Sequence, residues 1–593
     1  MRLLPSRLAS GLGAGLLALA LMGAGPAAPQ PGSKPPVVPE VPAAGPCAAA
    51  APLVETSLRQ PSKAAREALA AAPLYEAELS LDPEKGLLTG RLRVTVPASW
   101  EGPIVLVLPV EGGTSASPFE WSAPRMAVGA GQLAPVAPKV QQGLLIFEGP
   151  AGEGPRTVAL ELQATFPSLG PPGLNDAFLA LQPGPIDFEL GSLAAHRLGM
   201  TLREAYPVLL ARGAGPRLAP TPWGAPLPSP PACHLVSVEV PRGHTLRASG
   251  LQVGRIPEGE DRLRFAFAAG ELRRFSLVAL PEERPAVEAK QKGLTLRVSA
   301  ESEESARRLL GWTRAALASL EAEWGPYPRA TLEIATVPLS GAVDGLRGGG
   351  LVLVSTVFEG DGDIGALASL QESGGGADLQ ELTLVHQLAH QWIGEQVATP
   401  GPAQPVLEEL VASYGLLRHA ARRHGAASAE ALSDSVLAQL YRAWRMFGAQ
   451  DDAADRPFEA LGLGGWVGLC AGKGSLLLPK AEAAFGPKPV RLAVRRWLAE
   501  GRGGVRDRAS LEAALVKAVG EKRAPEVRPL FARHLDEAHG DEDLGVADLG
   551  ALGNFGMLPQ GMPMAPFGMG PIDDAALQQM MEEMLRALQG VSP

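Results

Sequence analysis

The sequence predicts a multidomain α+β protein with an N-terminal β-sandwich-like domain, then an α/β unit, then an α-helical C-terminal region. Apolar and polar residues alternate with a period of two from about residue 74 to residue 285, which is typical of strands. From about residue 294 helical periodicity appears, first between short strands and then alone. The chain has 593 residues, of which 46% are apolar, so it can build several buried cores.

Residues 1–25 have the pattern of an export signal. Arg2 and Arg7 precede the apolar run 8–22, and small residues follow where a signal peptidase would cut. The run is short for a membrane span, which needs about 20 residues, so a cleaved signal is favoured and a retained single N-terminal anchor is the alternative. We therefore expect an exported protein, in a bacterial periplasm or cell envelope or secreted, with no second apolar run of spanning length.

Residues 26–70 are rich in proline and alanine and are expected to form an unfolded spacer. The chain has three cysteines, Cys47, Cys233 and Cys470, which are too few for a disulfide scaffold. In an oxidising compartment this odd number leaves at least one thiol free or in an intermolecular bridge. The sequence does not indicate which cysteines pair.

Residues 71–288 form the predicted β domain. Turn residues separate its short alternating runs, and helical periodicity is scarce. Clear examples of the alternation are Leu92, Val94 and Val96, then Val158, Leu160 and Leu162, then Val236, Val238 and Val240.

Residues 289–450 are predicted to mix strands with helices, and residues 451–540 to be helical. The expected elements of the mixed unit are a strand at 294–298, a helix at 301–323, strands at 331–337 and 351–356, and a helix at 381–396. Residues 541–571 are a linker rich in glycine, proline and methionine, and residues 572–593 form an amphipathic helix that we expect to dock on the body or on a protein partner.

The net charge of −10 argues against nucleic acid as a partner, because phosphate binding requires an excess of lysine and arginine. The sequence contains no serine-hydrolase elbow, nucleotide-binding loop or C-x-x-C pair. A basic helix face is expected to be exposed to solvent; it consists of Arg418, His419, Arg422, Arg423 and His424.

A candidate metal site lies at the end of the helix predicted over 381–396. His386 and His390 are four residues apart, so both imidazoles lie on one helix face and can reach one ion. Glu409, 19 residues after His390 in another helical run, could be a third ligand, leaving the fourth tetrahedral position open. The alternative is a metal-free site in which the three side chains hydrogen-bond to one another.

With these residues the chain resembles the gluzincin aminopeptidases of the aminopeptidase N family, whose signature is H-E-x-x-H, then eighteen residues, then E. The resemblance covers about residues 75–540 and implies a thermolysin-like zinc domain over 289–450 with Zn2+ as cofactor. Further segments resemble the family's motifs in the same order: Tyr206–Val208, Trp324–Pro328, His390–Val397 and Gly472–Leu477.

The departures from the family pattern fall on its chemistry. Gln387 stands where the family has the glutamate that acts as general base, and an amide cannot accept a proton near neutral pH. Ala471 stands where the family has the tyrosine that donates to the oxyanion, and the adjacent Cys470 is only a weak donor.

The family's amine-binding glutamate also has no clear equivalent. One alignment places Asp344 there, one methylene shorter, and a second alignment places Arg347 there, which would repel an ammonium group. Either alignment puts the exopeptidase anchor in doubt.

We interpret the chain as an exported zinc-binding pseudopeptidase with a peptide or protein ligand. The alternative is an active zinc aminopeptidase with a substitute base, for which Glu395 and Glu408 are the nearby carboxylates. Because Glu408 is about 100° around its helix from Glu409, we expect it to point away from the metal.

Overall fold

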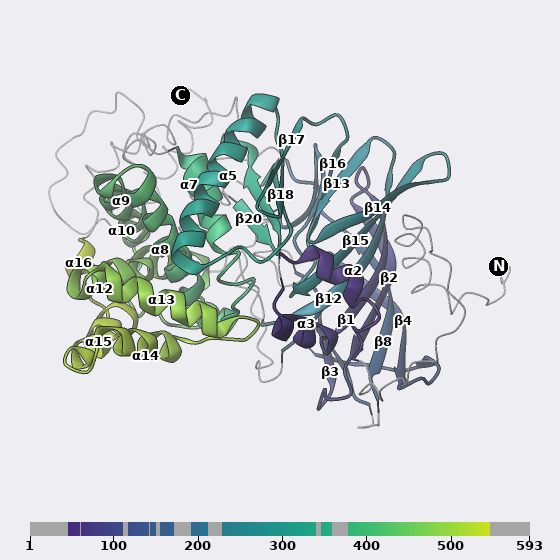
Figure 1. The fold of residues 1–593 in the computed structure, drawn as a ribbon, viewed down its shortest axis with the longest axis horizontal. Helices are drawn as coiled ribbons and strands as arrows, with labels where there is room; N and C mark the ends of the chain where they lie inside the picture. Colours follow the sequence, from purple (N-terminus) through teal and green to yellow (C-terminus); the bar gives the residue numbers. More distant parts are fainter. Residues whose placement is uncertain are drawn as a thin grey trace, which may run out of the picture.

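The N-terminal half of the chain is built from strands and the C-terminal half from helices, which confirms the predicted α+β class (Figure 1). This computed structural model describes residues 45–59, 61–110, 117–141, 143–149, 154–170, 191–211, 228–339, 345–358 and 378–545. The predicted export signal, Asp344, the Met-rich linker and the terminal helix lie outside the described residues.

An eight-stranded sheet forms the centre of the N-terminal domain. In spatial order its strands are β14 (Leu251–Glu258), β15 (Arg262–Leu272), β12 (Ala232–Pro241), β1 (Leu74–Asp82), β2 (Leu87–Val96), β8 (Arg156–Thr165), β4 (Phe119–Val128) and β5 (Ala134–Pro135). β1 pairs in parallel with β12, whereas β2 pairs antiparallel with both β1 and β8. Alternate residues of β1 and β8 are buried, as the period of two predicts.

Two four-stranded sheets complete this domain. One has the order β13 (His244–Ala248), β16 (Leu277–Pro281), β10 (Gly199–Leu202) and β9 (Leu193–His196), and the other β11 (Val208–Leu209), β3 (Ile104–Val107), β7 (Leu144–Phe147) and β6 (Lys139–Gln141). Apolar side chains from all three sheets join in one buried core.

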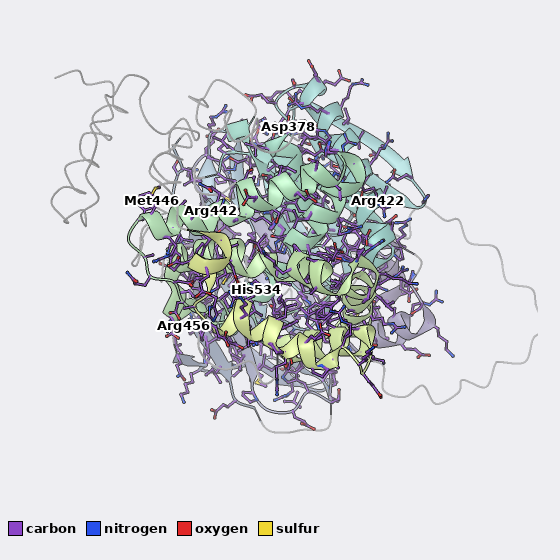
Figure 2. All side chains as sticks on the ribbon, turned by 90° about the vertical axis from the view of Figure 1, so that its left-hand side faces the viewer. Asp378, Arg422, Arg442, Met446, Arg456 and His534 are labelled. Carbon is purple, nitrogen blue, oxygen red and sulfur yellow. A yellow bond between two sulfur atoms is a disulfide. The ribbon has the colours of Figure 1, made fainter. Side chains whose placement is uncertain are left out.

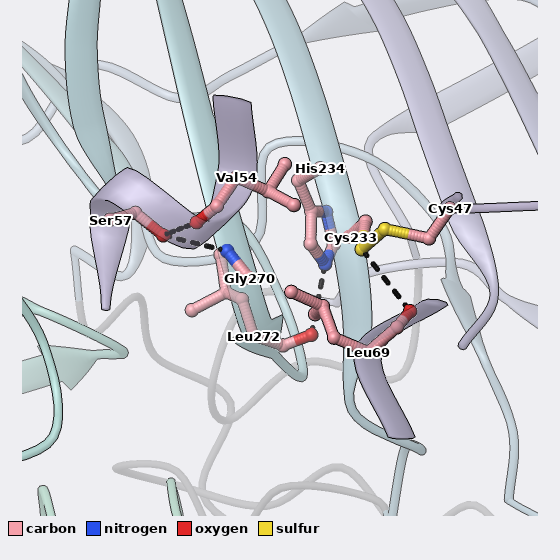
Figure 3. The surroundings of a disulfide bond; sticks show 8 residues. All are labelled: Cys47, Val54, Ser57, Leu69, Cys233, His234, Gly270 and Leu272. Atoms are coloured by element: carbon pink, nitrogen blue, oxygen red, sulfur yellow. Dashed lines mark hydrogen bonds between the residues drawn. A yellow bond between two sulfur atoms is a disulfide. The ribbon is translucent and has the colours of Figure 1, made fainter. Parts of the chain in front are cut away.

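The second half of the predicted spacer is folded, which corrects the expectation for residues 26–70. Residues 45–70 include α2 (Ala51–Val54), the helical turn η1 (Glu55–Ser57) and α3 (Lys63–Ala70), and a disulfide joins Cys47 to Cys233 on β12 (Figure 3). The composition is that of a spacer, but a few apolar residues fall at positions that pack on the sheet. The buried side chains of this contact are Ala50, Val54, Leu58, Leu69, Leu235 and Ala268.

The α/β unit contains a five-stranded sheet with the order β17 (Ala286–Gln291), β18 (Leu294–Ser299), β19 (Thr331–Val337), β21 (Leu351–Ser355) and β20 (Gly345–Gly348). β18, β19 and β21 are parallel, and β20 is an antiparallel edge strand. Helix α5 (Glu303–Trp324) begins after Ser302, whose side chain accepts from the Ser305 N–H, and ends at Gly325, whose φ of 97° favours glycine. Helix α7 (Leu379–Ala389) packs against β20 and β21.

The helical region begins with α8 (Val406–Arg423). It continues with α9 (Ala426–Leu432), α10 (Ala438–Met446), α11 (Phe458–Gly465), α12 (Leu477–Phe485), α13 (Pro487–Gly501), α14 (Arg508–Val519), α15 (Ala524–Phe531) and α16 (Gly540–Leu544). Shorter helical segments are η3 (Thr356–Phe358), η4 (Gly401–Ala403), η5 (Ser433–Leu437), η6 (Trp466–Lys473), η7 (Gly474–Leu476) and η8 (Ala532–Asp536).

One helical run of the described residues, Phe458–Phe485, is long and apolar enough to cross a membrane by length and composition, although no second such run was expected. In its most apolar window, 89% of the residues are buried inside the protein. Its apolar character is therefore accounted for by its place in the core.

Candidate metal centre

Three side chains from α7 and α8 converge where the end of one helix meets the start of the other. Helix α7 begins at Asp378, whose carboxylate accepts from the Gln380 N–H, and ends at His390, which caps it. His386 lies one turn earlier on the same face, and Glu409 lies in the first turn of α8. The structure thus brings together the three predicted ligands, His386, His390 and Glu409.

The donor atoms have the spacing of a shared metal shell. His386 Nε2 lies 3.1 Å from His390 Nε2 and 3.3 Å from Glu409 Oε2, and His390 Nε2 lies 3.7 Å from Glu409 Oε1. Donors about 2.0–2.1 Å from a tetrahedral ion are about 3.3–3.4 Å apart. Burial, the charge of Arg347 and the neighbouring His386 lower the pKa of His390 well below its usual range, so at neutral pH its imidazole is neutral, as a metal ligand must be. The donor set fits Zn2+.

The architecture of this chain is similar to that of solved M1 zinc metallopeptidases. No protein-family model matches the sequence, and no curated protein matches it. A variant of the M1 zinc metallopeptidase from Deinococcus radiodurans superposes with a TM-score of 0.52 at 18% identity, covering 79% of this chain and 95% of that chain. The M1 zinc metallopeptidase from the same organism gives 0.51 at 20% identity, covering 78% and 94%. The chain has the two-domain fold of the M1 zinc metallopeptidases.

A further M1 structure, the Deinococcus radiodurans variant bound to a Tyr-Ser-Ala substrate, gives a TM-score of 0.51 at 19% identity, covering 79% of this chain and 95% of that chain. At these identities the similarity establishes the M1 fold.

Gln387 lies between the two histidines in the chain and packs towards the edge strand of the M1 sheet. Its side chain is buried, and among the described residues its Oε1 has no hydrogen-bond partner. A Cβ at Gly345 on β20 would lie only 2.8 Å from Gln387 Cγ, so glycine permits this close approach. The position of the expected general base therefore holds a buried amide with an unpaired acceptor.

Ala471 lies on η6, which packs against α8, the helix that carries Glu409. Burial, together with the charges of Glu409 and Asp455, raises the pKa of the Cys470 thiol well above its usual range. The Cys470 thiol is buried and lies 3.5 Å from the Ala454 carbonyl oxygen, to which it donates. It is therefore engaged in the core, and Ala471 itself has no donor.

Asp344, one of the two sequence candidates for an amine-binding residue, lies outside the described residues. Arg347, the other candidate, is buried on β20 and donates a hydrogen bond to Glu408. Glu408 also accepts from the Thr399 hydroxyl at 3.0 Å. The edge strand thus carries a guanidinium group next to the ligand helix, and its charge reaches His390.

Both carboxylates considered as substitute bases are engaged by arginines. Glu395 accepts from Arg274 Nη2 at 2.8 Å, and although burial raises its pKa, the arginine charge lowers it overall. Glu408 is held by Arg347, and burial raises its pKa. Each would have to leave its ion pair to accept a proton from a substrate or water.

The basic face that was expected to be exposed to solvent is largely paired with carboxylates, which corrects that expectation. Arg418 and Arg422 lie 3.9 and 3.1 Å from the buried Glu323 of α5. The remaining members of the face, His419, Arg423 and His424, surround the buried Glu381 of α7. The spacing of residues along α8 does not predict these ion pairs, because Glu323 and Glu381 belong to other helices.

Proposed function

We propose that this protein is exported and uses its M1 fold to bind zinc and peptide ligands without hydrolysing them. The observation that carries the proposal is Gln387, a buried carboxamide adjacent to the two histidines. An amide can hold a ligand by hydrogen bonds but cannot take up the proton that hydrolysis releases. Loss of a positioned base typically reduces the rate by about 10²–10⁴-fold.

Two further features of the site support binding over catalysis. Ala471 offers no donor to a developing oxyanion, and loss of one such donor typically costs about 3 kcal/mol. Arg347, which one alignment places at the amine-binding position, is buried in an ion pair with Glu408 and offers no acceptor to the ammonium group of a peptide. Both features leave the three-ligand site itself intact.

We infer that His386, His390 and Glu409 would hold the zinc ion, which when bound would polarise a carbonyl as a Lewis acid. Gln387 has both a donor and an acceptor to offer the backbone of a bound peptide. Because Arg347 offers no acceptor for a free amine, we expect the ligand to enter as an internal or N-blocked segment.

Export is supported by the disulfide between Cys47 and Cys233, because such bonds persist in oxidising compartments. The first residues of the sequence supply the signal pattern. The alternative function, a working aminopeptidase, would require Glu395 or Glu408 to be released from its arginine.

The decisive experiment compares hydrolysis and binding by the zinc-loaded full-length protein. A panel of aminoacyl and short-peptide substrates is assayed with and without a chelator, and binding of free and N-acetylated peptides is measured by calorimetry. We expect no turnover, and tighter binding of the acetylated peptides. Turnover that disappears both on chelation and in His390→Gln would overturn the proposal in favour of an active metallopeptidase.

A further inference from the structure

A second group of metal-ligating side chains lies at the opposite end of the α7–α8 pair. Glu381 is in the first turn of α7, and His419 and His424 are at the end of α8. Glu381 precedes His390 by 9 residues and His419 follows Glu409 by 10, which at about 1.5 Å per residue separates the two groups by about 14–15 Å. The roles of the helices are reversed here, since α7 gives the carboxylate and α8 gives the imidazoles.

The donor atoms of this second group have the separations of a tetrahedral shell. His419 Nε2 lies 3.2 Å from Glu381 Oε1, and His424 Nε2 lies 3.3 Å from Glu381 Oε2. Each distance is close to the edge of about 3.3–3.4 Å in a shell with 2.0–2.1 Å bonds, and the two histidines face different oxygens of the carboxylate. All three ligand atoms lie within 4.8 Å of one another.

The hydrogen bonds of His419 orient its ring so that one nitrogen faces Ser319 and the other faces Glu381. Ser319 Oγ has one hydrogen, which it donates to the Ala315 carbonyl at 3.1 Å. It therefore accepts from His419 Nδ1, also at 3.1 Å, so this nitrogen carries the proton. Nε2 of His419 faces Glu381 Oε1 at 3.2 Å, a position from which an imidazole can share a proton with the carboxylate or bind a cation beside it.

His424, the second imidazole of the group, also faces Glu381. The Nε2 atom of His424 is buried and has no hydrogen-bond partner among the described residues, although it faces Glu381. The Glu381 side chain is 2% exposed and that of His419 0%, whereas that of His424 is 21% exposed. An ion could thus enter past His424 and be held by two buried partners.

Arg423 is the competing cation. Its Nε lies 2.6 Å from Glu381 Oε1, and its side chain is 37% exposed. The guanidinium can remain hydrogen-bonded to this oxygen beside a bound ion, or it can move into solvent. Figure 2 shows the molecule from its helical side and labels Asp378, the N-cap of α7, and Arg422, the neighbour of Arg423.

We propose that Glu381, His419 and His424 bind a second divalent transition-metal ion, for which zinc fits the two imidazoles and one carboxylate best. The site is distinct from the group of His386, His390 and Glu409. Its ion would fasten the start of α7 to the end of α8. It would thereby fix the alignment of the two helices that carry the first group.

The test counts zinc ions in the full-length protein after metal stripping, reloading and dialysis, by elemental analysis. Wild type should retain two equivalents per chain. His424→Gln and His390→Gln should each lose one, and the double variant should lose both. His244→Gln, a histidine on β13 outside both groups, is the matched control and should retain two. Arg423→Gln should retain both and bind the second ion more tightly.

A thermal measurement covers the case in which a variant folds poorly. Zinc should still raise the melting temperature of His390→Gln, and it should not raise that of the double variant. If wild type retains one zinc ion and His424→Gln retains it too, the proposal of a second site is overturned. If wild type retains one zinc ion that is lost in His424→Gln and kept in His390→Gln, the second site is supported and the proposed zinc ligands of the first group are refuted.

Discussion

Arg347 on β20 donates a hydrogen bond to Glu408, the residue immediately before the proposed ligand Glu409. Both side chains are almost completely buried, and the Thr399 hydroxyl supplies a second donor to Glu408. The pair ties the edge strand of the sheet to the first turn of α8. The backbone that presents Glu409 is therefore fixed by an ion pair that is not itself part of the metal site.

Breaking this pair on one side should be costly. Glu408→Gln removes a buried carboxylate from the Arg347 guanidinium, and breaking a buried ion pair on one side typically costs about 3–5 kcal/mol of unfolding free energy. Urea denaturation would measure it, and the double variant Arg347→Leu with Glu408→Leu should recover most of the loss. The exposed pair of Arg307 and Glu303 is the control, since Glu303→Gln should cost less than about 1 kcal/mol. Equal losses at the two sites would contradict this account.

Restoring the general base should not by itself restore activity. Gln387→Glu supplies a carboxylate, but Ala471 leaves the oxyanion without a donor, so we expect little hydrolysis of aminoacyl substrates. Gln387→Glu combined with Ala471→Tyr should exceed either single variant in kcat. High activity from Gln387→Glu alone would refute the importance given to Ala471.

Removing the disulfide should lower stability and leave the metal site in place. The bond closes a loop spanning 186 residues, and native disulfides typically contribute about 2–5 kcal/mol. Cys47→Ser should therefore unfold at lower urea concentration than wild type, while zinc retention is unchanged. Wild type under reducing conditions should match Cys47→Ser. If the reductant destabilised the variant as well, another bond would have to be responsible.

Stability should fall as the pH drops below about 6.5. Burial lowers the pKa of His234 to about 3 and that of His196 and His534 to about 4. Between these values and the unfolded value of about 6.5, the unfolded chain binds more protons, so acid favours unfolding by up to about 1.4 kcal/mol per pH unit for each histidine.

Unfolding free energies at pH 7.5, 6.5 and 5.5 would check this dependence. His234 donates from Nε2 to the Leu272 carbonyl and accepts from the Tyr206 hydroxyl. A glutamine side chain also has a donor and an acceptor, and it does not titrate. His234→Gln should therefore show a shallower pH slope than wild type, whatever its absolute stability. An unchanged slope would exclude His234 as a contributor.

Fold class was predictable from sequence because it depends on local periodicity. The strands alternate in burial with a period of two, and His386 and His390 share a helix face whatever surrounds them. The choice of Glu409 as their partner needed the family resemblance, because nothing local brings its helix to theirs.

The remaining features depend on contacts between elements far apart in sequence. Periodicity shows that His419 and Arg423 share a helix face, but it does not show that Glu381 of another helix covers that face. Composition likewise marked residues 45–70 as spacer, although Cys47 bonds to a strand of the sheet. Neither contact can be recognised from the residues of a single helix or strand.

The parallel pairing of β1 with β12 has a consequence for how the chain is made. About the length of a whole small domain separates these two neighbouring strands in the sequence. The other edge of β12 pairs with β15, which comes still later in the chain. During synthesis or translocation, the edge of β1 that pairs with β12 stays unpaired until β12 has emerged. We expect a chain arrested before residue 232 to aggregate, because an unpaired strand edge recruits other chains, and folding to be slow, because its central contacts are non-local.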